Sequence, residues 1–149
     1  MSTSDKAAAP APERLDADAI AKIFAASPFI DMLGLKVVAL DYDASELTVR
    51  MPLTPTLERR EGTRQFHGGA LAAFIDIAGD FALGMMIGGG IPTMNLRIDC
   101  LKPAVGDGVT ACARVRRRGR TVAVIDIDVS DDKGSLVAIG RGTYVPVVG

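Results

Sequence analysis

The feature that most constrains the fold is the segment 70–91, which is almost entirely apolar and yet contains two aspartates, Asp76 and Asp80. In a membrane each aspartate would cost about 2.5–3.5 kcal/mol near the middle of the span. No second segment of this kind occurs, so we expect no association with a membrane. The sequence instead predicts a helix over 69–87, about 28 Å long, which is apolar on nearly every side and must be covered all round. The glycines at 88–90 would end it.

The rest of the chain predicts one further helix and six strands. Apolar residues recur with a helical period over 15–26, and Ser27-Pro28 would end that helix. The expected strands are 35–40, 45–51, 93–101, 109–116, 122–129 and 136–145. The predicted fold class is α+β, an antiparallel β-sheet wrapped around one long central helix and preceded by a short N-terminal helix.

Apolar and polar residues alternate in the strand 93–101. Because successive side chains of a strand point to opposite faces, we expect two sets of residues that face opposite ways. One set is Met94, Leu96, Ile98 and Cys100, and the other is Thr93, Asn95, Arg97 and Asp99.

Length and charge limit the domain organisation and the partners. The chain has 149 residues, which suits a single domain, predicted over 14–149. Residues 1–13 are rich in alanine, proline, serine and charged residues, which predicts a disordered tail. Its net charge of −1 provides no footprint for nucleic acid. The N-terminus lacks a basic region followed by an apolar stretch, and two cysteines are too few for a disulfide framework. We therefore predict a cytoplasmic protein.

The two aspartates of the long helix are the informative polar residues. Asp76 and Asp80 lie four residues apart, on one face of the helix, and an ionised carboxylate in apolar surroundings is costly unless it is paired. For Asp80 we expect a structural partner at the helix–sheet edge, such as an arginine. For Asp76 the nearby His67-Gly68-Gly69 segment favours a role in catalysis, because N–H groups at a helix start suit an oxygen that becomes an oxyanion.

The sequence predicts no metal and no other cofactor. His67 is the only histidine, and the two cysteines are far from it in the sequence, so an ordinary transition-metal site cannot be assembled within one chain. A Gly-x-Ser-x-Gly nucleophile elbow is absent as well.

The segment Gln65-Phe66-His67-Gly68-Gly69, with Asp76 nine residues after the histidine, resembles the hot-dog thioesterases, and within them the phenylacetyl-CoA thioesterase-like (PaaI-type) branch. The strand 93–98, the segment 101–104 and the hairpin 118–121 extend the resemblance over roughly residues 33–145. The resemblance implies the hot-dog fold and an acyl-CoA thioesterase, which hydrolyses an aryl or medium-chain thioester of coenzyme A to the free acid and CoA. It also implies a homo-oligomer, a dimer or a homotetramer built as a dimer of dimers, with active sites at the subunit interfaces.

The resemblance also implies roles for single residues. Asp76 would be the nucleophile or the general base, and the Gly68 N–H, near His67, would polarise the thioester carbonyl. Thr93 would come from the neighbouring subunit and help to position water. Candidate substrate-binding residues are Gly69, Gln65, Asn95, Arg118, Gly119 and Arg120.

Glu61 departs from the family pattern, which usually has Asn or Gln six residues before the histidine. If Glu61 faces Asp76, repulsion between the carboxylates would raise one pKa and make a coupled acid–base pair. Alternatively, it points into solvent beside Arg59, Arg60 or Arg64, and Gln65 supplies the missing amide. The residues leave both alternatives open.

Three further questions stay open at this point. The first concerns a basic cluster, which comprises Arg114, Arg116, Arg117, Arg118 and Arg120. This cluster is either a solvated strand face, balanced by Asp126 and Asp128, or a contact for CoA phosphates. A non-catalytic acyl-CoA-binding or regulatory hot-dog domain is the main alternative function, and a hot-dog dehydratase or hydratase, which needs a histidine acting with an acid, is the other. The sequence does not define the acyl group.

Overall fold

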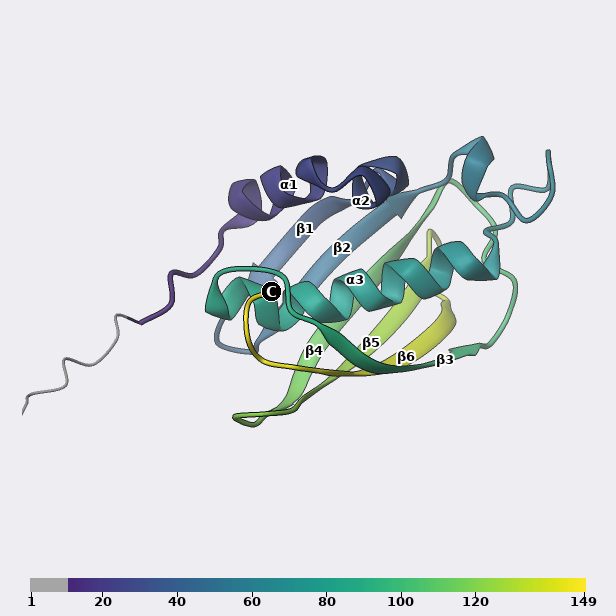
Figure 1. Ribbon diagram of the computed structural model, residues 1–149. Helices are drawn as coiled ribbons and strands as arrows, with labels where there is room; N and C mark the ends of the chain where they lie inside the picture. The colour runs from purple at the N-terminus through teal and green to yellow at the C-terminus, as the bar shows by residue number, and fades with distance from the viewer. Residues whose placement is uncertain (1–10) are drawn as a thin grey trace, which may run out of the picture.

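The structure is a computed structural model that describes residues 11–149. Most of the tail predicted over 1–13 therefore lies outside the described residues. Six strands form one antiparallel sheet, as the sequence predicts, and their order in the sheet is β1-β2-β4-β5-β6-β3 (Figure 1). Their bounds, in sheet order, are β1 (Lys36–Asp41), β2 (Glu46–Pro52), β4 (Gly108–Arg118), β5 (Ala123–Asp131), β6 (Leu136–Tyr144) and β3 (Thr93–Cys100).

The long apolar helix α3 (Gly68–Ile87) lies across one face of this sheet. Its start is capped by His67, whose Nδ1 accepts a hydrogen bond from the Gly69 N–H at 2.8 Å. It ends at Gly88, whose φ of 96° is a left-handed conformation that glycine adopts without strain. Although α3 is long and apolar enough to cross a membrane, 72% of its most apolar stretch is buried inside the protein, as in a core helix.

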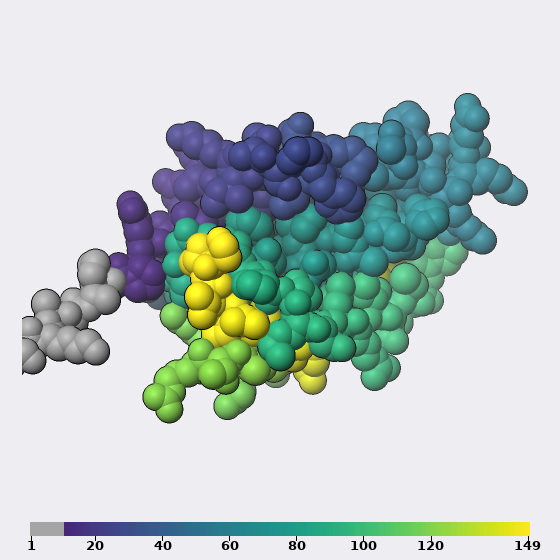
Figure 2. Space-filling model, viewed as in Figure 1, coloured from purple at the N-terminus to yellow at the C-terminus, as the bar shows by residue number. Residues whose placement is uncertain are grey.

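Two short helices, and not one, precede the sheet. Asp16 caps α1 (Ala17–Ala26) by accepting a hydrogen bond from the Ala19 N–H at 2.8 Å. The Ser27-Pro28 pair ends α1, but Pro28 also begins α2 (Pro28–Leu33), which the sequence analysis did not predict. Proline is well suited to the first position of a helix, because its fixed φ matches the helix and the missing N–H has no partner there. Helix α1 contacts both α2 and β1, so the two helices together cover the β1 side of the sheet (Figure 2).

Candidate active site

The central contact of the site joins α3 to the first residue of β3. Thr93 Oγ1 donates a hydrogen bond to Asp76 Oδ1 at 2.8 Å. Asp76 is partly exposed and Thr93 is exposed, so a ligand can reach both groups. The resemblance implied that Thr93 would approach from a neighbouring subunit. In this structure, however, Thr93 and Asp76 meet within one chain.

A β-bulge brings Thr93 to this face. The pairing of β3 with β6 shifts between Thr93, which lies opposite Tyr144, and Asn95, which lies opposite Thr143. One extra residue therefore separates the two positions, and Thr93 and Asn95 point to opposite faces of the sheet. The predicted alternation, which placed them on one face, is wrong at this point. Thr93 faces α3, whereas Asn95 shares the outer face with Arg97 and lies away from Asp76.

Asp80 has a partner other than the expected arginine. Its Oδ1 accepts a hydrogen bond from the Ile91 N–H at 2.6 Å, and Ile91 lies two residues before Thr93. Burial, more than repulsion by Asp76, raises the pKa of Asp80 to about 7, although the Ile91 N–H opposes the shift. Asp80 thus ties the segment that leads into β3 to α3.

The start of α3 presents a free backbone donor. His67, Gly68 and Gly69 are all exposed. The Gly68 N–H has no acceptor among residues 11–149, whereas the Gly69 N–H is occupied by the His67 ring. Nothing lies within 4 Å of where a Gly68 Cβ would stand, so the space on that side of the residue is open. A carbonyl oxygen is the kind of group that the Gly68 N–H can bind.

Gly68 and Asp76 are too far apart to act on one thioester. Asp76 comes eight positions after Gly68 in the helix, which corresponds to about 12 Å along the axis of α3. A nucleophile and the carbon that it attacks lie about 3–3.5 Å apart, and the carbonyl oxygen is bonded to that carbon. Within a single chain, therefore, the polarising donor and the carboxylate belong to different half-sites.

The loop that leads into α3 contains a hydrogen-bonded turn. Glu58, which the sequence analysis did not single out, accepts hydrogen bonds from the Gly62 N–H at 2.9 Å and the Arg64 N–H at 2.8 Å. The Arg59 N–H also bonds to the Gln65 carbonyl at 2.8 Å, which closes the turn. Glu61 is exposed and forms no hydrogen bond or ion pair with residues 11–149, so the pairing of Glu61 with Asp76 is not seen within one chain.

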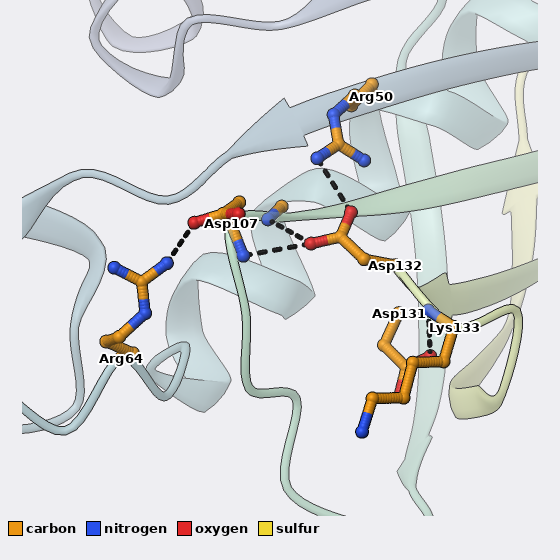
Figure 3. A network of polar contacts seen from close by, with 7 residues as sticks. Arg50, Arg64, Asp107, Asp131, Asp132 and Lys133 are labelled. Atoms are coloured by element: carbon orange, nitrogen blue, oxygen red, sulfur yellow. Dashed lines mark hydrogen bonds and ion pairs between the residues drawn. The ribbon is translucent and has the colours of Figure 1, made fainter.

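A network of charged groups fixes this loop to the sheet (Figure 3). Arg64 forms an ion pair with Asp107, just before β4. The Asp107 N–H in turn donates to Asp132 Oδ2 at 2.9 Å, and Asp132 Oδ1 pairs with Arg50 of β2 at 2.7 Å. Through Asp132, the loop is connected to β2 and to the turn after β5.

Two hollows adjoin the start of α3 and differ in character. The first is lined by Gly68 and by three polar side chains, Arg59, Gln65 and Lys102, among mainly apolar residues. The second is apolar and lies between α2 and α3; its lining includes His67 and Gly69. The apolar side chains that line the second hollow are Phe29, Met32, Leu33, Leu57 and Ala70.

The arginines of the basic cluster lie elsewhere. Arg118, Gly119 and Arg120 are at the tip of the β4–β5 hairpin, at the opposite end of the fold from the start of α3 (Figure 1). On the outer face of the sheet, Arg114 pairs with Glu46, and Arg116 pairs with Asp126 at 3.5 Å. For Arg114 and Arg116 the structure therefore agrees with the solvated strand face.

A tyrosine that the sequence analysis missed contacts the backbone of the site. Tyr144 Oη donates a hydrogen bond to the Asp76 carbonyl at 3.1 Å, and the Tyr144 side chain is fully buried. No sequence pattern points to this contact, because it depends on the register of β6 beneath α3. Among residues 11–149 no group of three His, Cys, Asp or Glu side chains could hold a metal ion.

The chain is similar to known thioesterases. The family model described as Thioesterase superfamily matches residues 65–138. The acyl-coenzyme A thioesterase PaaI of Escherichia coli K12 is 31% identical over 111 residues, which are 74% of this chain and 76% of PaaI. The solved structure of E. coli PaaI, from the phenylacetic acid degradation operon, has a TM-score of 0.74 at 25% identity and covers 87% of this chain and 91% of its own. The medium/long-chain acyl-CoA thioesterase YigI of E. coli K12 is 23% identical over 133 residues, 79% of this chain and 84% of YigI.

Proposed function

Since the chain belongs to the thioesterase superfamily, we propose that it hydrolyses acyl-CoA thioesters and that Asp76 is the catalytic carboxylate. The observation that carries this proposal is the hydrogen bond from Thr93 to Asp76 at 2.8 Å. It fixes the orientation of a solvent-accessible carboxylate without neutralising it, since threonine carries no charge.

Asp76 has two routes to the same products. As a general base, its free oxygen takes a proton from a water molecule while the water oxygen attacks the thioester carbon. As a nucleophile, it attacks that carbon itself, and water then hydrolyses the resulting anhydride. In both routes the C–S bond breaks, the CoA thiolate leaves and takes up a proton, and the acid is released. The hydrogen bond from Thr93 supports either route.

The site is completed by a second copy of the chain. Asp76 needs a donor for the developing oxyanion, and the Gly68 of its own chain is about 12 Å away along the helix. A dimer in which the start of one α3 approaches Asp76 of the other supplies that donor. His67 then serves as the cap that fixes the first turn of α3, and Gly69 allows the substrate to approach closely.

The two hollows at the start of α3 suggest how the substrate lies. The hollow with Arg59, Gln65 and Lys102 suits the polar coenzyme, because cations and an amide can bind its phosphates and amide groups. The apolar hollow beside Phe29 and Met32 suits the acyl group. This orientation favours Arg59 over Arg118 and Arg120 as a CoA contact, and it fits an aryl or a medium-chain acyl group.

Three further expectations keep the status of predictions. They are the absence of a metal or other cofactor requirement, assembly beyond the dimer, and a cytoplasmic location. A non-catalytic acyl-CoA-binding domain is the alternative that the activity measurement must separate from the enzyme.

The test is hydrolysis of a panel of acyl-CoAs that contains phenylacetyl-CoA, hydroxybenzoyl-CoA and medium-chain acyl-CoAs. The release of the free CoA thiol measures the rate. We expect turnover of at least one class and a fall in kcat of about 10²–10⁴-fold, or more, in Asp76→Ala. Tight binding of acyl-CoA without thiol release would support the non-catalytic alternative. Normal turnover by a folded Asp76→Ala variant would remove Asp76 from the mechanism.

A further inference from the structure

Tyr144 connects the two residues of the central contact, Thr93 and Asp76. It lies on β6 directly opposite Thr93 in the β3–β6 pairing, and its hydroxyl donates to the Asp76 backbone carbonyl at 3.1 Å. One side chain is therefore adjacent to the strand position of Thr93 and bonded to the helix position of Asp76. We propose that Tyr144 is a positioning residue, which holds Asp76 at hydrogen-bonding distance from Thr93.

The surroundings of Tyr144 fix its ring in one place. Gly79 of α3 and Gly142 of β6 both face it, and a Cβ at either glycine would overlap the ring or its hydroxyl. The side chain is 0% exposed. A side chain that is confined on both sides passes a displacement of β6 on to α3, because densely packed groups have few other arrangements.

The hydroxyl keeps its proton and stays available as a donor at this position. Burial, followed by the negative charges of Asp76 and Asp80, raises the pKa of Tyr144 far above its usual range. The phenol therefore keeps its proton at every pH at which the protein would be assayed. The Asp76 carbonyl is the only acceptor of this hydroxyl among residues 11–149.

This inference rests on the proposed function, since it assigns Tyr144 to the geometry of the same reaction. Tyr144 touches neither substrate nor water in this account. Its hydroxyl fixes the position of the Asp76 backbone, and Thr93 then fixes the orientation of the Asp76 carboxylate. Loss of the hydroxyl should lower kcat, because the carboxylate is misplaced, and should leave KM nearly unchanged.

The chain offers a closely matched control. Tyr42 is the only other tyrosine, and its hydroxyl also donates to a backbone carbonyl, that of Leu15, at 2.7 Å. Both hydrogen bonds are partly buried, and the one made by Tyr42 lies between the strand β1 end and the segment before α1, away from Asp76. Tyr42→Phe and Tyr144→Phe thus remove the same group from the same kind of bond.

The experiment measures kcat, KM and thermal unfolding for both variants with the best acyl-CoA substrate. We expect Tyr144→Phe to lower kcat about 10-fold with KM within a factor of two, and Tyr42→Phe to leave both unchanged. Equal kcat values in the two variants would overturn the proposal. If wild-type protein hydrolyses no acyl-CoA, the proposed function fails, which is a different result from an active enzyme that is insensitive to Tyr144→Phe.

A double-mutant cycle with Thr93→Val separates positioning from a general loss of stability. If Tyr144 acts by holding Asp76 near Thr93, Tyr144→Phe should have little further effect on kcat once Thr93 cannot bond. If the double variant loses kcat by the product of the two single-variant fold-losses, the proposal is contradicted. Should Tyr144→Phe fail to fold, 4-aminophenylalanine at position 144 keeps a donor on the ring. That variant should retain kcat within a few fold, and a loss as large as that of Thr93→Val would contradict the proposal.

Discussion

Thr93 and Asp76, seventeen residues apart in the sequence, are joined by a 2.8 Å hydrogen bond between Oγ1 and Oδ1. The contact depends on the bulge at the start of β3, which turns Thr93 towards α3. Two other bonds support it, since Ile91 is held by Asp80 and the Asp76 carbonyl by Tyr144. The carboxylate is thus oriented by an uncharged donor on β3, whose leading segment is tied to α3 by Asp80 and whose neighbour β6 is tied to α3 by Tyr144.

Replacing Thr93 by valine tests the value of this contact. Valine keeps the shape and removes the hydroxyl, so we expect kcat to fall about 10-fold or more, because a hydrogen bond to a charged group contributes about 1.5–3 kcal/mol. The control is Thr143→Val, on the neighbouring strand opposite Asn95. Its hydroxyl makes no hydrogen bond to residues 11–149, so its kcat should stay at the wild-type value. Equal loss in the two variants would show that Thr93 matters only as a strand residue.

Replacing Gly68 by proline removes a single backbone donor. Gly68 is the first residue of α3, where proline fits, and His67 has φ −66° and ψ 139°, a conformation that is compatible with a following proline. We expect kcat to fall about 10²–10³-fold, as when an oxyanion donor is lost. In Gly68→Ala the N–H remains and the Cβ meets nothing within 4 Å, so activity should persist. Equal activity of the proline and alanine variants would contradict the role of this N–H.

Sequence patterns were sufficient for the architecture and insufficient for the site. The long apolar helix and six strands required a wrapped antiparallel sheet, and the strand bounds agree within about two residues. Helix α2 was missed, because Pro28 ends one helix and starts the next. The face of Thr93 was wrong, because a bulge adds one residue that an alternating pattern cannot reveal. Tyr144 was missed, because its contact with Asp76 spans 68 residues and depends on register.

Asp80 should make stability depend on pH. Its pKa is about 7 in the folded protein and about 3.9 in an unfolded chain, so the folded state binds more protons between these values. The contribution of Asp80 is therefore fully present below about pH 4 and is lost as pH rises through about 7. Asp80→Asn removes this titration, so the wild type should lose about 2 kcal/mol of unfolding free energy relative to the variant between pH 5 and 8. Urea unfolding at a series of pH values measures the difference, and parallel pH curves would contradict it.

The two glutamates of the loop should differ in importance. Glu58 accepts bonds from two backbone N–H groups of the turn, whereas Glu61 is exposed without a hydrogen bond to residues 11–149. We expect Glu58→Ala to raise KM several-fold, because the loop that carries Arg59 and Gln65 loosens. Glu61→Ala should leave kcat, KM and the pH profile unchanged. If wild-type kcat falls at alkaline pH and Glu61→Ala removes or shifts that fall, Glu61 faces Asp76 of a partner chain and shares a proton with it.

We propose that Asp76 acts on a thioester held by Gly68 of a second chain, and mixing two inactive variants tests this shared site most directly. Gly68→Pro chains contribute an intact Asp76, and Asp76→Ala chains contribute an intact Gly68. When the two are unfolded together and refolded, half of the randomly assorted dimers are mixed and carry one intact site, so roughly a quarter of wild-type activity should return. Each variant refolded alone provides the control. If the mixture stays as inactive as its components while both variants assemble normally, the donor and the carboxylate do not form a shared site.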